Sequence, residues 1–189
     1  MQGGIYNVSV RKIASLLNSS TAPVYTSFTN IEEIKNMLLD KALSLLSTYT
    51  EKTYTHDTFL NIGVGLLIFA RENNILYRTL FLENNHFRNI QVAFSEVNLK
   101  QMKKERSLSL FSDSELSAIL DKMTIYTHGL AALLCGGMLE NTDDAWFISK
   151  LEEMGEVVIG DMAYKKANAI LKCEERRCDH EAHNAIKRD

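Results

Sequence analysis

Apolar residues recur every three or four positions along most of this chain, and short polar segments separate the stretches that show this period. A period of about 3.6 residues is typical of an α-helix that buries one face. The pattern predicts helices over approximately 10–17, 20–28, 30–50, 56–72, 75–85, 87–105, 113–135 and from 143 onward. Since no segment alternates convincingly as a β-strand would, we expect an all-α fold.

The segment 56–72 differs from the others because it is apolar on nearly all sides, which predicts a helix at the centre of the core. Its apolar residues are Phe59, Ile62, Val64, Leu66, Leu67, Ile68 and Phe69. Gly63 and Gly65 within it would allow a neighbouring helix or a ligand to approach closely. A phosphate-binding loop at Gly63-Val64-Gly65 is the alternative, but neither the preceding strand nor the following lysine that it needs is present.

The other long helices carry apolar stripes. These comprise Ile34, Leu38, Ala42, Leu45 and Tyr49; Ile90, Phe94 and Val97; Leu116, Leu120, Met123, Tyr126 or Thr127, Leu130, Leu134 and Met138; and Phe147, Leu151, Met154, Val158 and Met162. We expect Asn30 and Thr142 to cap helices and Gly136-Gly137 to end one. The last two helices are apolar on more than one side, which would suit a two-fold four-helix dimer interface.

The stretch from Ser9 to Phe28 predicts two short helices joined by a tight turn. The inward residues are Val10, Ile13, Ala14, Leu17, Val24 and Phe28. Ser9 suits the cap of the first helix, Asn18 tolerates the positive φ of a turn, and Pro23 fits the first turn of the second helix. The outer face is left to Thr21, Ala22, Tyr25, Thr26 and Ser27. This pattern predicts a helix-turn-helix, whose second helix would lie in a DNA major groove.

Composition favours a helical protein that does not span a membrane. The chain has 189 residues with 1 proline and 9 glycines, which favours helices over hairpins. It has 3 cysteines, no run long enough to span a membrane and no signal-peptide pattern, so we expect a cytoplasmic protein without a membrane partner. The net charge is −3 at pH 7, and residues 1–46 hold one more basic than acidic side chain. Tight DNA binding would therefore need a dimer to double the phosphate contacts.

Two motifs resemble the TetR family of bacterial transcriptional regulators. The first is Val10-Arg11-x-Ile13-Ala14 with Leu17, Ser20-Thr21, Val24-Tyr25-x-x-Phe28 and Glu32-Glu33-Ile34; the second is Thr127-His128-Gly129-Leu130-Ala131-x-Leu133. The second motif resembles a His-Gly signature in the ligand domains of one subgroup. The resemblance implies a helix-turn-helix headpiece at 1–49, a ligand-binding and dimerisation domain at 50–171, and a charged tail at 172–189.

The function that this resemblance implies is a ligand-responsive transcriptional regulator, a repressor in the usual case. It would act as a homodimer on a pseudo-palindromic double-stranded DNA operator. Thr21, Ala22 and Pro23 would face base edges, while Ser9, Tyr25, Thr26 and Ser27 would meet phosphates. Arg11 and Ser20 complete the predicted DNA-binding residues.

We expect a small, mainly apolar effector to enter the helical domain. From the helix faces, the predicted lining is Phe59, Gly63, Leu67, Phe94, Met123, Tyr126 and His128. His128 has two interpretations, a satisfied core or interface histidine and a pocket residue that hydrogen-bonds the effector.

One alternative follows from residues 1–8. In the TetR family a helix precedes the helix-turn-helix, and here Gly3-Gly4-Ile5-Tyr6-Asn7-Val8 resembles the loop that follows that helix. The family's usual lysine and histidine are also replaced by Ile31 and Ser27. The chain could instead be a helical ligand-binding or dimerisation module that has lost DNA binding.

The sequence contains only weak indications of a metal site, a second nucleic-acid contact or a catalytic site. Cys173, Cys178, His180 and His183 admit a zinc site, but the cysteines are more widely spaced than in common zinc motifs and a charged helix end is the simpler interpretation. The basic run Lys100–Arg106 is either a solvated helix end or a second nucleic-acid contact. No paired carboxylates, Ser/His/Asp set or nucleotide loop is recognisable, so we expect no enzyme, cofactor or resident metal.

Overall fold

The computed structural model describes residues 5–82 and 87–186, and it describes the side chains of these except Tyr6, 87–94 and 173–186. Within this part the chain is helical and contains no strand, which confirms the all-α prediction. The elements are η1 (Ile5–Asn7), α1 (Val10–Leu16), α2 (Ala22–Ser27), α3 (Ile31–Thr50), α4 (Thr58–Glu72), α5 (Asn74–Tyr77), η2 (Arg78–Leu82), α6 (Phe87–Met102), η3 (Arg106–Leu108), α7 (Asp113–Cys135) and α8 (Asp144–Ile186).

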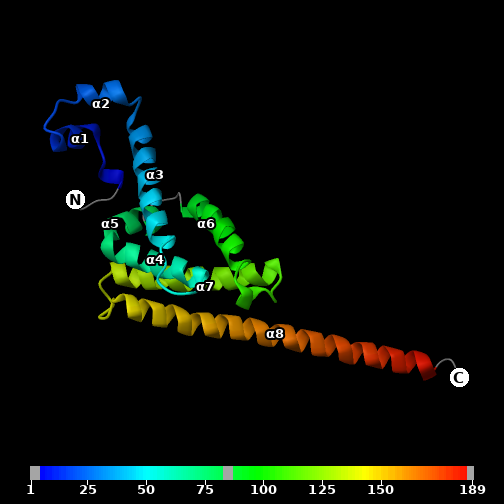
Figure 1. The fold of residues 1–189 in the computed structure, drawn as a ribbon. Helices are drawn as coiled ribbons and strands as arrows, with labels where there is room; N and C mark the ends of the chain where they lie inside the picture. The colour runs from blue at the N-terminus through cyan, green and yellow to red at the C-terminus, as the bar shows by residue number, and fades with distance from the viewer. Residues whose placement is uncertain (1–4, 83–86, 187–189) are drawn as a thin grey trace.

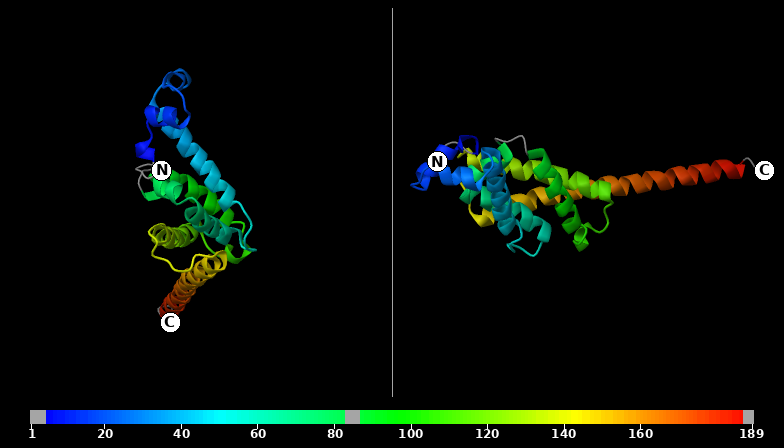
Figure 2. Two further views of the ribbon diagram at one scale, coloured as in Figure 1. Left: turned by 90° about the vertical axis from the view of Figure 1, so that its left-hand side faces the viewer. Right: turned by 90° about the horizontal axis from the view of Figure 1, so that it is seen from above.

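The molecule has a small headpiece and a larger helical bundle joined by one long helix (Figure 1). Helices α1 and α2 lie at the N-terminal end of α3, and the other end of α3 packs on α4. Helix α8 lies on the side of the bundle opposite the headpiece, and its C-terminal half extends well beyond the other helices (Figures 1 and 2). None of the described helices is both long and apolar enough to cross a membrane.

Helix α4 is the centre of the bundle, as its apolar sequence predicts. Residues Val64 to Ala70 are all buried, and the helix contacts α3, α5, α6, α7 and α8. Gly65 makes the closest approach, because a Cβ atom added there would collide with the backbone of Tyr49 and Thr50 on α3. The Gly63-Val64-Gly65 run therefore lies inside a helix and forms no phosphate-binding loop.

The headpiece follows the predicted local structure closely. Ser9 caps α1 by accepting from the Lys12 backbone N–H, and Asn18 adopts a φ of 49° in the turn. Its buried apolar residues are Ile5, Ala14, Val24 and Ile34, and these lie apart from the main core. Two details are wrong: α2 is shorter than the predicted 20–28, and Leu17 is 68% exposed instead of facing inward. The turn begins at Leu17, so the helical period no longer sets its direction.

The apolar stripe of α3 is confirmed at Ile34, Ala42 and Tyr49, but two of the predicted positions are wrong. Leu46 is fully buried, whereas Leu38 and Leu45 are exposed. Only the C-terminal part of α3 packs on α4, and the contact at Gly65 sets which face it presents. The neighbouring Leu39 packs against the main core, so Leu38 lies on a face of α3 that the described residues leave exposed.

Several helix ends also differ from the prediction. Asp143 rather than Thr142 caps α8, since its carboxylate accepts from the Trp146 N–H at 2.7 Å. Met138 lies beyond the end of α7 and is exposed, and Val97 on α6 is exposed as well. The predicted tail from 172 is helical through Ile186 as a continuation of α8. The predicted caps Ser9 and Asn30 and the end of α7 at Gly136 are confirmed.

Candidate functional site: a cavity in the bundle and the headpiece

A cavity of about 560 Å³ lies between α4, α6, α7 and α8, a size within the range of small-molecule sites. Most of its lining is apolar, with polar atoms from a few side chains. The lining residues are Asp57, Phe59, Leu60, Ile62, Gly63, Leu66, Phe81, Ser95, Asn98, Leu120, Met123, Thr124, Thr127, His128, Leu151, Glu152, Gly155, Glu156, Ile159 and Gly160.

Small residues keep this space open. A Cβ atom on Gly63 would lie 3.0 Å from Leu151 Cδ1 and 3.7 Å from Thr127 Oγ1, so a larger residue on α4 would press on both α7 and α8. Gly155 also lines the cavity from α8, but an added Cβ there would make only an ordinary contact, 4.0 Å from the Met123 methyl group. Glycine in a helix interior is otherwise unfavourable, and the need for space in the cavity explains why it occurs at these positions.

An aromatic cluster forms one wall. The ring centroids of Phe81 and His128 are 4.9 Å apart, and those of Tyr77 and Phe81 are 5.0 Å apart. Residues 78–82 form a π-helical turn, and such turns often occur at functional sites. The wider turn sets Phe81 at the cavity while Tyr77 is fully buried behind it.

His128 is tied to this cluster by a hydrogen bond. The Tyr77 hydroxyl and His128 Nδ1 are 2.8 Å apart, and the tautomer of the ring decides which of them donates. Burial lowers the pKa of His128 to about 4 and raises the pKa of Tyr77. Both groups are therefore neutral at neutral pH.

The cavity includes four of the seven predicted pocket residues: Phe59, Gly63, Met123 and His128. Leu67 is completely buried in the core, and Tyr126 is half-buried elsewhere, so neither lines the cavity. The side chain of Phe94 lies outside the described residues. The prediction missed the wall that α8 contributes, because helical periodicity suggested a dimer interface for this helix. The missed residues are Glu152, Gly155, Glu156 and Gly160, which lie between the apolar positions of its stripe.

Three carboxylates border the cavity, namely Asp57 before α4 and Glu152 and Glu156 on α8. Asp57 caps α4, since its Oδ1 accepts from the Leu60 N–H at 2.9 Å. The described lining contains no lysine or arginine.

A second cavity of about 570 Å³ lies next to the first and shares Ile62 and Asn98 with it. Its wall is more polar and includes the connector between α3 and α4. Buried Asn61 holds that connector in place: its Oδ1 accepts from the backbone N–H groups of Tyr54 and Thr55, and its Nδ2 donates to the Thr55 carbonyl.

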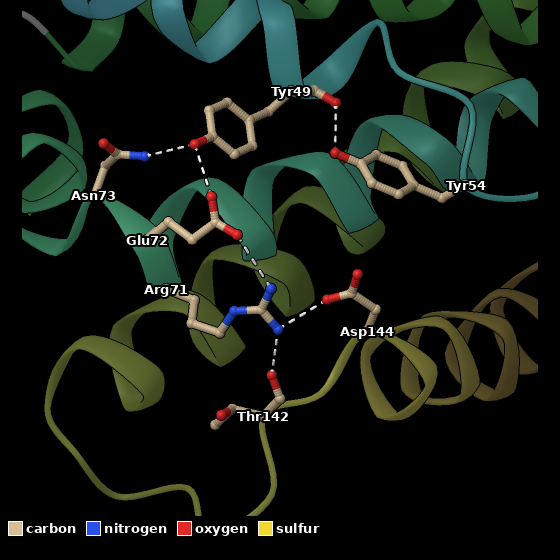
Figure 3. A network of polar contacts seen from close by, with 7 residues as sticks. All are labelled: Tyr49, Tyr54, Arg71, Glu72, Asn73, Thr142 and Asp144. Carbon is tan, nitrogen blue, oxygen red and sulfur yellow. Dashed lines mark hydrogen bonds and ion pairs between the residues drawn. The ribbon is translucent and has the colours of Figure 1, made fainter.

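A polar network joins the end of α3 to α4 and to the start of α8 (Figure 3). The Tyr49 hydroxyl donates to Glu72 Oε2 at 2.8 Å, and the other oxygen of Glu72 pairs with Arg71 at 3.3 Å. The same guanidinium pairs with Asp144 at 2.8 Å and donates to the Thr142 carbonyl at 2.7 Å. Helix α3, which carries the headpiece, is thus linked to α4 and α8, two of the helices that line the cavity.

The predicted DNA-binding residues lie together on the headpiece. Arg11, Ala22, Pro23, Tyr25, Thr26 and Ser27 are exposed on α1 and α2, Ser20 is exposed in the turn, and Ser9 and Thr21 are half-buried. The Thr26 hydroxyl donates to the Pro23 carbonyl at 2.9 Å, so its hydrogen is already used within α2. In the basic run 100–106, Lys103 pairs with Asp113 at 2.8 Å.

The described side chains contain no group of three or more histidine, cysteine or acidic residues that could hold a metal ion. The side chains of Cys173, Cys178, His180 and His183 lie outside the described residues.

A scan of protein-family models, a search of curated proteins and a search of solved structures each found no match to this chain. The resemblance to the TetR family therefore rests on the motif residues alone.

Proposed function

We propose that this chain is a ligand-responsive DNA-binding regulator of the TetR type that acts as a homodimer. The observation that carries the proposal is that one helix, α3, holds the headpiece at one end and packs against the cavity-lining helix α4 at the other. A molecule bound in the cavity would contact α4, and a displacement of α4 would move α3 and the headpiece with it. Regulation requires two sites joined by such an element.

The headpiece supports DNA contact by its exposed surface. The outer side of α2 is short and polar, and Tyr25 on it is 66% exposed although it is a large aromatic residue. Arg11 and Lys12 are exposed on the neighbouring helix α1. Basic groups and hydroxyl donors beside an exposed short helix are the groups that phosphate positioning uses.

The dimer is supported by an exposed apolar face on α7 and α8. Lys122 and Asp161 form an ion pair at 3.4 Å between these helices, and exposed Ile125 and Val157 each lie about one turn from it. Tyr164 continues this face along α8. We define Ile125, Val157 and Tyr164 as the α7–α8 face. Large apolar side chains exposed on one face beside polar groups favour an interface between subunits.

Helix α4 would couple ligand binding in the cavity to the position of the headpiece. An occupant that pushes on Gly63 or Phe59 moves α4, and the tight contact at Gly65 transmits that displacement to the end of α3. The Tyr49–Glu72 hydrogen bond holds the same junction together. The two headpieces of a dimer would then change their spacing, which sets whether they fit successive major grooves.

The experiment is selection of bound fragments from a random-sequence DNA pool by the full chain, followed by gel shift of the enriched sequence. We expect a pseudo-palindrome. Tyr25→Ala and Arg11→Ala should weaken binding, whereas Thr48→Ala, an exposed change on the far part of α3, should leave it unchanged. Absence of any enriched sequence would reject the DNA-binding proposal.

The dimer has its own test by sedimentation velocity. Val157→Glu should convert a dimer to a monomer, and Thr48→Glu, which adds the same charge at an exposed position on α3, should not. A wild-type chain that sediments as a monomer at micromolar concentration would reject the dimer.

The second candidate is a helical ligand-binding or dimerisation module that does not bind DNA. It is favoured by the exposure of both Leu16 and Leu17 at the end of α1, together with the small number of buried residues in the headpiece. A module of this kind would dimerise and bind a small molecule but enrich no DNA sequence.

A further inference from the structure

The ionisable side chains that border the main cavity carry one sign of charge. Asp57, Glu152 and Glu156 are acidic, and the described lining has no lysine or arginine. The remaining ionisable side chain in the lining, His128, is kept neutral by burial. The cavity is therefore an apolar space with a negatively charged rim.

Glu152 and Glu156 are four residues apart on α8 and so lie on the same face of that helix. No hydrogen bond or ion pair joins either carboxylate to the described residues, whereas nearby acidic groups are paired. Glu153 binds Lys150 at 2.6 Å, Asp161 binds Lys165 at 2.8 Å, and Glu115 binds Lys166 at 2.7 Å. Two like charges at this spacing repel each other, and a cation between them would relieve that repulsion.

The rest of the wall suits an apolar body attached to that cation. Phe59 and Phe81 contribute aromatic side chains to the lining, and Leu120, Met123 and Leu151 contribute aliphatic ones. An organic cation is attracted both by carboxylates and by the faces of aromatic rings. The volume of about 560 Å³ accommodates a drug-sized molecule rather than a bare metal ion.

We propose that the cavity takes an amphipathic organic cation, with its charged group between Glu152 and Glu156 and its apolar body against Phe59 and Phe81. The regulatory meaning of this ligand rests on the proposed function, but the binding itself does not. A neutral apolar effector, which the sequence alone suggests, would leave both carboxylates without a counter-charge. An organic anion would be repelled by all three acidic groups.

The test is titration calorimetry on the full chain with three probes of equal chain length: octyltrimethylammonium, octan-1-ol and octanoate. We expect the cation to bind about tenfold more tightly than the alcohol, the size that two exposed carboxylates together support. Added salt should reduce this preference. Octanoate should bind most weakly.

The matched variants are Glu152→Gln with Glu156→Gln, and Glu153→Gln as the control. The double variant should lose about tenfold in affinity for the cation and keep its affinity for octan-1-ol. Glu153→Gln changes an acid on the same helix that does not line the cavity, so it should bind as the wild type does. Circular dichroism and thermal unfolding establish that each variant is folded.

Equal or tighter binding of octan-1-ol, no change in the double variant, or no binding of any probe would each overturn the proposal. Failure of the proposed function is recognised separately by DNA selection. A chain that enriches DNA but does not prefer the cation refutes only the ligand class, and one that prefers the cation but enriches no DNA refutes only the DNA-binding regulator.

Discussion

The hydroxyl of Tyr77 and the Nδ1 of His128 lie 2.8 Å apart and join the last residue of α5 to α7. Tyr77 is fully buried, so this hydrogen bond satisfies a polar group that would otherwise be costly inside the core. The imidazole is held neutral because burial penalises its charged form. The pair therefore makes the stability of the bundle depend on pH.

We expect the chain to lose stability as the pH falls below 6.5. Burial lowers the pKa of His128 from 6.5 to about 4, so between these values the unfolded chain binds a proton that the folded chain does not. Stability is thus fully present above 6.5 and declines as the pH falls toward 4. Between about pH 7.5 and about pH 5, the loss should be about 2 kcal/mol in urea unfolding.

His128→Gln is the control for that assignment, because it removes the titrating group. Its free energy of unfolding should fall by about 2 kcal/mol less than that of the wild type over the same interval. Identical pH slopes for the two proteins would show that another group is responsible.

Gly65→Ala should destabilise the chain by about 1–3 kcal/mol. The added methyl group would collide with the carbonyl of Tyr49 and with Thr50 Cα, which are backbone atoms that cannot rotate away. Gly160→Ala on α8 is the matched change, since an added Cβ there meets nothing within 4 Å. It should stabilise the helix by about 0.5–1 kcal/mol. Thermal unfolding measures both, and equal effects would contradict the tight α3–α4 contact.

Leu46→Ala and Leu45→Ala test which face of α3 is buried. Leu46 is 0% exposed and Leu45 is 37% exposed, although they are neighbours of the same chemistry. Leu46→Ala should cost about 2–5 kcal/mol because it leaves a cavity in the core. Leu45→Ala should cost less than about 1 kcal/mol. If urea unfolding gave the reverse order, the register of α3 would be the one that sequence periodicity favours.

Arg71→Met should lower the free energy of unfolding by about 1–3 kcal/mol, since it leaves the Thr142 carbonyl and the Asp144 carboxylate without their partner. Lys150→Met removes an exposed pair with Glu153 and should leave the free energy of unfolding nearly unchanged. The arginine also lies 5.5 Å from the Phe147 ring centroid.

A double-mutant cycle of Arg71→Met with Asp144→Asn separates the ion pair from this packing, because only the ion pair is lost in both single variants. Additive effects in the cycle would mean that the pair contributes nothing to stability.

Local patterns along the chain determined the fold class, the central helix, several helix caps and part of the pocket lining. The apolar period predicted the all-α fold, and the fully apolar segment 56–72 predicted the central helix α4. Ser9, Asn30 and Asn18 were predicted correctly because caps and turns depend on residues within one helical turn. Phe59, Gly63, Met123 and His128 were placed in a pocket because each lies on a helix face that points into the bundle.

Only tertiary packing decided the rest. Whether Leu45 or Leu46 is buried depends on how α3 meets Gly65 on the next helix, a packing contact that the period of α3 alone does not specify. The same packing buries Leu67 in the core and sets Glu152 and Glu156 at the cavity rim, because helical periodicity gives the faces of a helix but not which neighbour covers each face. The Arg71 network and the Tyr77–His128 pair likewise join residues that no local pattern relates.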